Sequence, residues 1–162
     1  MEDKASAFSK EKALSFSAPD LVQSFSQKNP RYSLKESEKL FEDLKLWLWA
    51  CAQRTRDQES EKDVPPTLTI SPELKNIDEL WHHFLESPKE YKFFCEKYLG
   101  HTVEHITLTE EELKSFRHLC ETNPEAARRA RQDELRPQLE YLYDLLGPDV
   151  LRRWYGSGNF KS

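Results

Sequence analysis

Apolar residues recur along this chain at the three- and four-residue spacing of amphipathic helices. The pattern predicts helices over about residues 19–28, 33–57, 75–86, 88–99, 110–122, 124–146 and 150–155. The stretch "TLTIS" at 67–71 favours an extended conformation, but no second segment offers itself as a strand partner. We therefore predict an all-α fold, a single compact domain of about six or seven helices.

Several residues mark where these helices begin and end. Ser33 with Glu36, and Thr109 with Glu112, have the spacing of a capping box, which opens a helix. Gly100 is well placed to end the helix that precedes it. Pro137 lies inside the helix expected over 124–146, where the missing backbone donor should kink or divide it.

The helix over 33–57 is expected to lie at the centre of the core. Its main apolar stripe contains Leu40, Phe41, Leu44, Trp47, Leu48 and Cys51. Leu46, Trp49 and Ala50 lie off that stripe, and a helix that is apolar on more than one side is usually buried. The alternative is that some aromatic side chains form a surface for a protein partner, and the candidates are Trp49, Phe93 and Trp154.

The two ends of the chain are expected to differ from the middle. Residues 1–16 are rich in Ser, Lys and Glu and are predicted to be a flexible tail, with a weak helix as the alternative. Residues 17–156 are predicted to form the helical domain. The last residues, 157–162, are predicted to fray.

Composition agrees with a helical domain that has a well-solvated exterior. Only 37% of residues are apolar, but 12% are aromatic, and each large ring buries much surface. Charged residues make up 33% of the chain. Four glycines among 162 residues are too few for the many tight turns of a sheet-rich fold.

Charge and cysteine content exclude several classes of protein. The net charge is −5, and the densest basic cluster, at 127–132, is followed at once by two acidic residues. Nucleic-acid binding is therefore not expected. Three widely spaced cysteines indicate a reducing, intracellular (cytoplasmic) compartment rather than a disulfide framework. The sequence also lacks an apolar run long enough to span a membrane.

The stretch 79–105 holds four of the five histidines and one cysteine, and it raises the question of a metal site. Zinc takes about four nitrogen or sulfur ligands, and the candidates are His82, His83, Cys95, His101 and His105. The alternative is that the histidines lie at the surface or hydrogen-bond, and that Cys95 fills the core. Zinc is the one cofactor considered, and the spacing matches no standard zinc finger.

Cys95 is also the one candidate nucleophile, which would need a nearby histidine and an oxyanion donor. Because it lies on the apolar stripe of its helix, a buried and unreactive thiol is the favoured interpretation. No phosphate-binding, dinucleotide-binding, zinc-protease or serine-hydrolase motif occurs in the chain. A non-enzymatic protein-binding or regulatory module is thus expected. The alternatives are a zinc-binding protein and a metal- or cysteine-dependent hydrolase centred on His82, Cys95 and His105.

The central segment "NIDELWHHFLESPKEYKFFCEKYLGHTVEHI" resembles the signature of the glycine-rich-domain-containing protein-like family. The family motif is Asp-x-x-Trp-His, then Tyr-x-x-Phe-Cys, then a glycine and a closing His-His-x-Pro. The matching residues are Asp78, Trp81, His82, Tyr91, Phe94, Cys95, Gly100 and His105. Looser similarity extends over about residues 29–155.

This resemblance implies a helical domain of unknown function, so it bears on the fold more than on the activity. The chain departs from the family at Glu104-His105-Ile106, which lacks the second histidine and the proline. That departure weakens the case for a site with many histidines. The glycine-rich region that gives the family its name is absent too.

Overall fold

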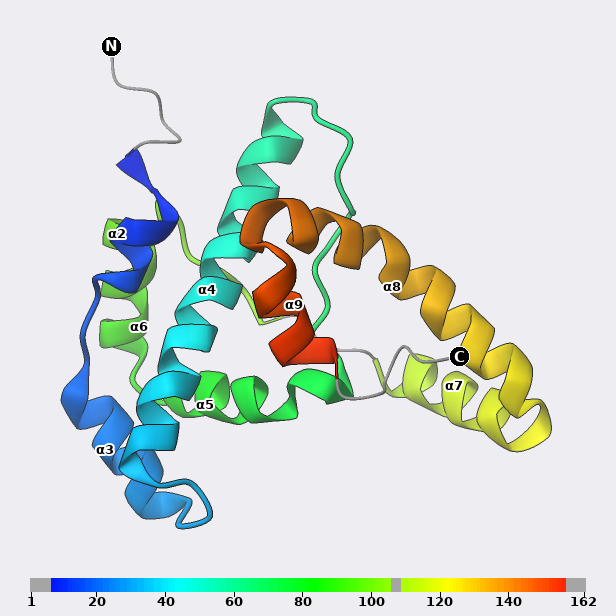
Figure 1. The fold of residues 1–162 in the computed structure, drawn as a ribbon, viewed down its shortest axis with the longest axis horizontal. Coiled ribbons are helices and arrows are strands. Elements are labelled where there is room, and N and C mark those ends of the chain that lie inside the picture. The colour runs from blue at the N-terminus through cyan, green and yellow to red at the C-terminus, as the bar shows by residue number, and fades with distance from the viewer. Residues whose placement is uncertain (1–6, 106–108, 157–162) are drawn as a thin grey trace.

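The computed structural model describes residues 7–105 and 109–156, and Figure 1 shows their arrangement. Within those residues there are eight α-helices and no strand, which confirms the all-α fold. The helices are α2 (Lys10–Leu14), α3 (Pro19–Lys28), α4 (Leu34–Glu59), α5 (Lys75–Leu85), α6 (Pro88–Phe94), α7 (Glu110–Thr122), α8 (Pro124–Leu146) and α9 (Pro148–Tyr155). A 3-10 turn, Pro72–Leu74, precedes α5, and a π-helical turn, Cys95–Leu99, continues α6.

The helix boundaries follow the local signals. The Ser33 hydroxyl accepts from the backbone N–H of Glu36 at 3.0 Å, and the Thr109 hydroxyl accepts from that of Glu112 at 3.1 Å. Gly100 has φ of +95° and ends the π-helical turn, where a residue with a side chain would be strained. Each of these three boundaries was predicted.

Two helices differ from expectation in their interior. Helix α8 runs without a break through Pro137, so the division that was one of the two expected outcomes does not occur. Proline there removes only the bond to the carbonyl of Asp133, and both residues are exposed, so water can satisfy that carbonyl. The helix predicted over 88–99 changes from α to π geometry at Cys95.

Helix α4 forms the centre of the fold, as predicted. Figure 1 shows α2, α3 and α6 on one side of it and α8 and α9 on the other. It contacts α5 and the π-helical turn after α6 as well as α2, α3 and α8. Large side chains fill the interior, and Trp47, Phe25, Phe84 and Phe94 are essentially inaccessible to solvent. Burial of this much aromatic surface is the main source of stability.

The stretch predicted as a tail or a weak helix contains a short helix at its described end. In α2 and just after it, Ala13 and Phe16 are buried, and the Phe16 ring lies 4.7 Å from that of Phe94. Buried Lys45 of α4 donates to the carbonyls of Leu14 and Phe16 at 2.9 and 2.7 Å. Residues 10–16 thus belong to the packed domain. The rest of the predicted tail, residues 1–6, and the C-terminal end, residues 157–162, lie outside the described residues.

The extended segment near Thr69 pairs with a side chain instead of a strand. Buried Gln138 of α8 accepts from the Thr69 N–H at 2.8 Å and donates to the Thr69 carbonyl at 2.9 Å. This bond pair fixes the connection between α4 and α5 against α8. No helix in the described ranges combines the length and apolarity that crossing a bilayer requires.

Candidate metal centre

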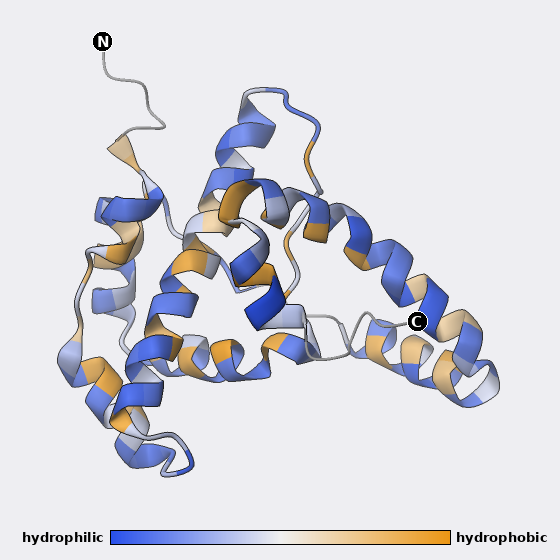
Figure 2. Cartoon of the chain, viewed as in Figure 1, coloured by the Kyte–Doolittle hydropathy of each residue, from blue (hydrophilic) through white to orange (hydrophobic). Residues whose placement is uncertain are grey.

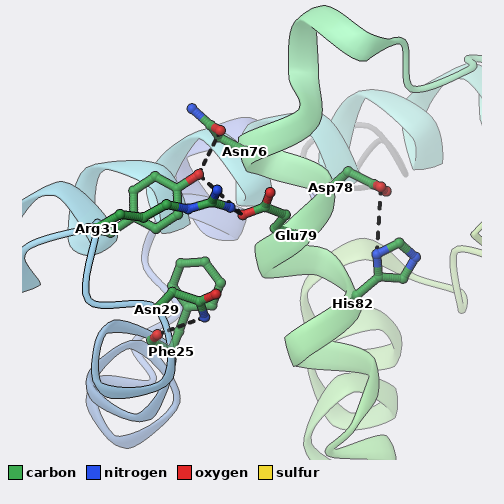
Figure 3. Close-up of polar contacts among 8 residues, drawn as sticks. Phe25, Asn29, Arg31, Asn76, Asp78, Glu79 and His82 are labelled. Atoms are coloured by element: carbon green, nitrogen blue, oxygen red, sulfur yellow. Dashed lines mark hydrogen bonds and ion pairs between the residues drawn. The ribbon is translucent and has the colours of Figure 1, made fainter.

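Helix α5 separates its residues onto three sides. Ile77, Leu80, Trp81 and Phe84 are buried against the core. Asp78 and His82 are four residues apart, hence on one side, one turn from each other (Figure 3). Glu79 points toward α3 and forms an ion pair with Arg31. The face with Asp78 and His82 is therefore free for another segment to approach.

That segment is Gly100–His105, and a buried hydrogen-bond chain holds it in place. The indole N–H of Trp81 donates to the Tyr91 hydroxyl at 3.1 Å. The hydroxyl in turn donates to the Val103 carbonyl at 2.6 Å. Burial raises the pKa of Tyr91, so its proton remains available for this bond. With Val103 anchored in this way, His105 is brought to α5.

His105 lies against α5 and contacts three of its residues. Its ring centroid is 4.3 Å from that of Trp81 and 4.5 Å from that of His82, with the two imidazoles stacked. Its Nε2 donates to Oδ1 of Asp78 at 2.5 Å, because an ionised carboxylate only accepts. His105 is 9% exposed and His82 is 54% exposed. His105 is thus held firmly, whereas the exposed side chain of His82 has room to rotate.

Asp78, His82 and His105 each offer one ligand atom, and these atoms lie within 4.8 Å of one another. Zinc binds nitrogen and carboxylate oxygen at about 2.0–2.2 Å, so two atoms bound to one ion lie roughly 3–4 Å apart. To bind one ion, Nε2 of His105 and Oδ1 of Asp78, now 2.5 Å apart, would have to separate slightly, and the exposed His82 side chain would have to turn toward them. Two imidazoles and a carboxylate suit zinc, and three protein ligands leave a position open for water or another donor.

Two of the predicted metal ligands lie elsewhere. His83 points toward α3, where its Nε2 is 2.8 Å from the Ser24 hydroxyl and its ring packs on Phe25. It points away because adjacent residues on a helix differ by about 100°. His101 lines a separate pocket with Cys51 and Arg54. Burial, helped by Arg56, lowers the pKa of His101.

Cys95 lies in the core, away from the donor cluster. Its side chain is fully buried, and it is not part of the donor cluster. Burial raises the pKa of the thiol, which disfavours the thiolate needed for attack or for metal binding. The packing interpretation made from its place on the apolar stripe agrees with this position. The alternative centre that combined Cys95 with His82 and His105 does not assemble in this structure.

The three aromatic residues considered for partner binding have different surroundings. Trp49 is buried, and its indole N–H donates to the Phe8 carbonyl at 2.9 Å. Trp154 is also buried and meets Trp47 edge to face. Both were wrong candidates for a surface: Trp49 lies beneath the segment that contains Phe8, and Trp154 turns inward from α9 onto Trp47. Only Phe93, 49% exposed on α6, is accessible to a partner.

Reasoning from the residues alone overlooked Asp78 as a metal ligand. The search considered histidine and cysteine, and Asp78 entered only through the family resemblance. The four-residue spacing of Asp78 and His82 on one helix was the available signal, since it places two donors side by side. The approach of His105, 27 residues after Asp78 in the chain, depends on the tertiary fold.

Comparisons of the chain with protein families, with curated proteins and with solved structures found no match. The resemblance to the glycine-rich-domain-containing protein-like family therefore stays a prediction that rests on the motif residues.

Proposed function

We propose that this chain is a non-enzymatic, metal-binding helical module that holds one zinc ion through Asp78, His82 and His105. The observation that carries the proposal is the convergence of three ligand atoms within 4.8 Å from two separate segments. Only two of the five ligands expected at first, His82 and His105, are retained. Asp78 completes the set.

The surroundings of the three donors support a binding role. Trp81 packs on the His105 ring and fixes its plane, which reduces the freedom lost when a metal binds. Metal would replace the proton that His105 and Asp78 share. The exposed His82 closes the set from the solvent side. The ion would tie α5 to the segment that leads toward α7, so its role would be to stabilise or regulate that junction.

Zinc titration of the untagged chain tests the proposal. We expect one zinc ion per chain, measured by competition with a chelating dye and by elemental analysis. Zinc at a hundredfold excess over its Kd should raise the free energy of unfolding by about 2.7 kcal/mol. The double variant His82→Ala, His105→Ala should weaken binding by more than about tenfold. Asp78→Asn keeps the shape of the side chain and tests the charge.

His118→Ala is the matched control, because it removes an exposed histidine from α7, far along the chain from the cluster. Circular dichroism verifies that each variant folds. If the parent chain binds no stoichiometric zinc, or if the control loses as much affinity as the double variant, the proposal fails. A loss of stability in Asp78→Asn without any zinc binding would assign the cluster a purely structural hydrogen-bonding role.

A further inference from the structure

His83, which does not join the metal centre, belongs to a second cluster of polar side chains, between α3 and the end of α5. The two helices are in contact, and a cavity of about 310 Å³ lies beside that contact. Its lining includes Ser24, Lys28, His83, Glu86 and Ser87. Figure 2 shows hydrophobic and hydrophilic residues in turn along α3 and α5, so each helix has a polar side next to its buried one.

The imidazole of His83 is held in one orientation by three neighbours. Its Nε2 is 2.8 Å from Oγ of Ser24, and its Nδ1 is 3.5 Å from Oε2 of Glu86. Its ring centroid is 5.6 Å from that of Phe25, and only 10% of the side chain is exposed. The ring therefore has a hydroxyl at one nitrogen and a carboxylate at the other. This is the arrangement of a nucleophile, a base and a group that orients the base.

The neighbours of the ring determine where the protons lie. An ionised carboxylate beside Nδ1 of His83 favours the tautomer with its proton on Nδ1, which leaves a lone pair on Nε2. The Ser24 hydroxyl has one proton and two acceptors within reach, His83 Nε2 at 2.8 Å and the Leu21 carbonyl at 3.0 Å. Donation to Leu21 would leave the serine oxygen facing the Nε2 lone pair with no proton between them. The hydroxyl therefore donates to His83.

The surroundings of Ser24 limit the kind of electrophile that it can attack. Ser24 lies inside α3, where backbone N–H groups bond within the helix, so this described turn offers no oxyanion hole. The Lys28 ammonium, one turn further along α3, also lines the cavity and lies 3.8 Å from Oε2 of Glu86. One exposed cation stabilises a tetrahedral intermediate only modestly. Amides and ordinary esters are thus poor substrates, and activated acyl donors, whose leaving groups depart readily, are suitable ones.

We propose that Ser24 is a modification site that accepts one acyl group from an activated donor of the thioester class. Its Oγ attacks the carbonyl carbon of the donor, the Oγ–C bond forms, and the C–S bond breaks. The proton passes from Oγ to Nε2 of His83 and then to the leaving thiolate. His83 is the general base, and Glu86 positions its ring. The product is an ester on Ser24, so the step requires no turnover, and it goes beyond the proposed zinc binding.

Labelling of the full chain with a fluorophosphonate tests the reactivity of Ser24. This reagent phosphonylates base-activated serines, with loss of fluoride, and leaves lysines unmodified. We expect one adduct per chain in intact mass spectrometry, and peptide mapping should place it on Ser24. S-phenyl thioacetate should transfer an acetyl group to the same serine. If Ser24 reacts no faster than Ser87, which lines the same cavity, the proposal is overturned. Phosphonylation without acetyl transfer would rule out the thioester class.

Three variants assign the roles within the cluster, with circular dichroism to verify that each folds. His83→Gln can still hydrogen-bond to Ser24 but cannot take its proton, so labelling should slow by about a hundredfold. Glu86→Gln removes only the orienting charge and should slow labelling by less. Ser87→Ala is the matched control and should label at the rate of the parent chain. An unchanged rate in His83→Gln would make the Ser24–His83 hydrogen bond purely structural and would contradict the proposal.

The double variant His82→Ala, His105→Ala separates this inference from zinc binding. It should lose zinc and still label Ser24 at the rate of the parent chain, because neither histidine lines the cavity. A folded double variant that no longer labels would overturn the proposal, since reactivity would then depend on the metal centre rather than on His83. A parent chain that labels Ser24 but binds no zinc would leave the acylation site in place and remove the metal site.

Discussion

Helices α5 and α7 have similar amphipathic patterns and very different surroundings. Along α5, Ile77, Leu80, Trp81 and Phe84 are all buried, whereas the equivalent stripe of α7 leaves Leu113 and Phe116 well exposed. Helix α5 is packed against α3, α4 and α6, and α7, among the elements that the structure describes, against α8 alone. The difference teaches that an apolar stripe predicts the face a helix will bury but not what will bury it.

Thiol labelling should give the largest contrast between the packed core and helix α7. Cys95 lies in the core and should react only when the whole domain unfolds, which typically costs about 5–15 kcal/mol. Cys120, partly exposed on α7, should react in the native state, several orders of magnitude faster. Intact mass spectrometry with peptide mapping, in buffer and in urea, measures both rates. Equal native labelling rates would show that the core around Cys95 opens to solvent as readily as the surface of α7 around Cys120.

Truncation of a phenylalanine in each region should give a smaller but still clear contrast. Phe94→Ala removes a fully buried ring and should lower the free energy of unfolding by about 3–5 kcal/mol. Phe116→Ala removes a ring that is exposed in the single chain and should cost less than about 1 kcal/mol. Urea unfolding of the two variants and the parent chain makes the comparison. A similar loss in both variants would place Phe116 in a packed interior.

The smallest effect concerns the pH dependence of stability. Burial lowers the pKa of His101 in the folded chain, so below about pH 6.5 the unfolded chain takes up this proton first. Stability should therefore fall as the pH drops from about 6.5 toward the lower, folded pKa. His101→Gln should lose less stability than the parent chain between about pH 7.5 and pH 5. An equal loss in the two chains would mean that His101 is solvated like an exposed histidine.

Local signals predicted the fold well because most of them act within one turn of helix. Ser33 and Thr109 each open a helix through a hydrogen bond to a residue three positions away, and Gly100 ends a helix through its own positive φ. The central place of α4 also followed from its two apolar sides. Division of the helix at Pro137 does not occur, because an exposed proline can remain in a long helix when water satisfies the carbonyl it leaves free.

The candidate site was only partly predictable, since it depends on contacts between distant residues. His82 and His105 were among the five expected ligands, but their joining requires the Trp81–Tyr91–Val103 hydrogen-bond chain. His83 and Cys95 had the right chemistry and the wrong direction, toward α3 and toward the core. Exposure of Trp49 and Trp154 was misjudged for the same reason, because their covers, the segment around Phe8 and Trp47 of α4, lie far from them in the chain.

The pairing of Gln138 with Thr69 bears on how this protein avoids aggregation. A run of β-favouring residues such as 67–70 can recruit the same run in another molecule if its backbone groups are left unpaired. Here the primary amide of one glutamine occupies both backbone groups of Thr69, as an adjacent strand would. A helical side chain thereby blocks a nucleation point for intermolecular β-structure at a residue in the middle of that run.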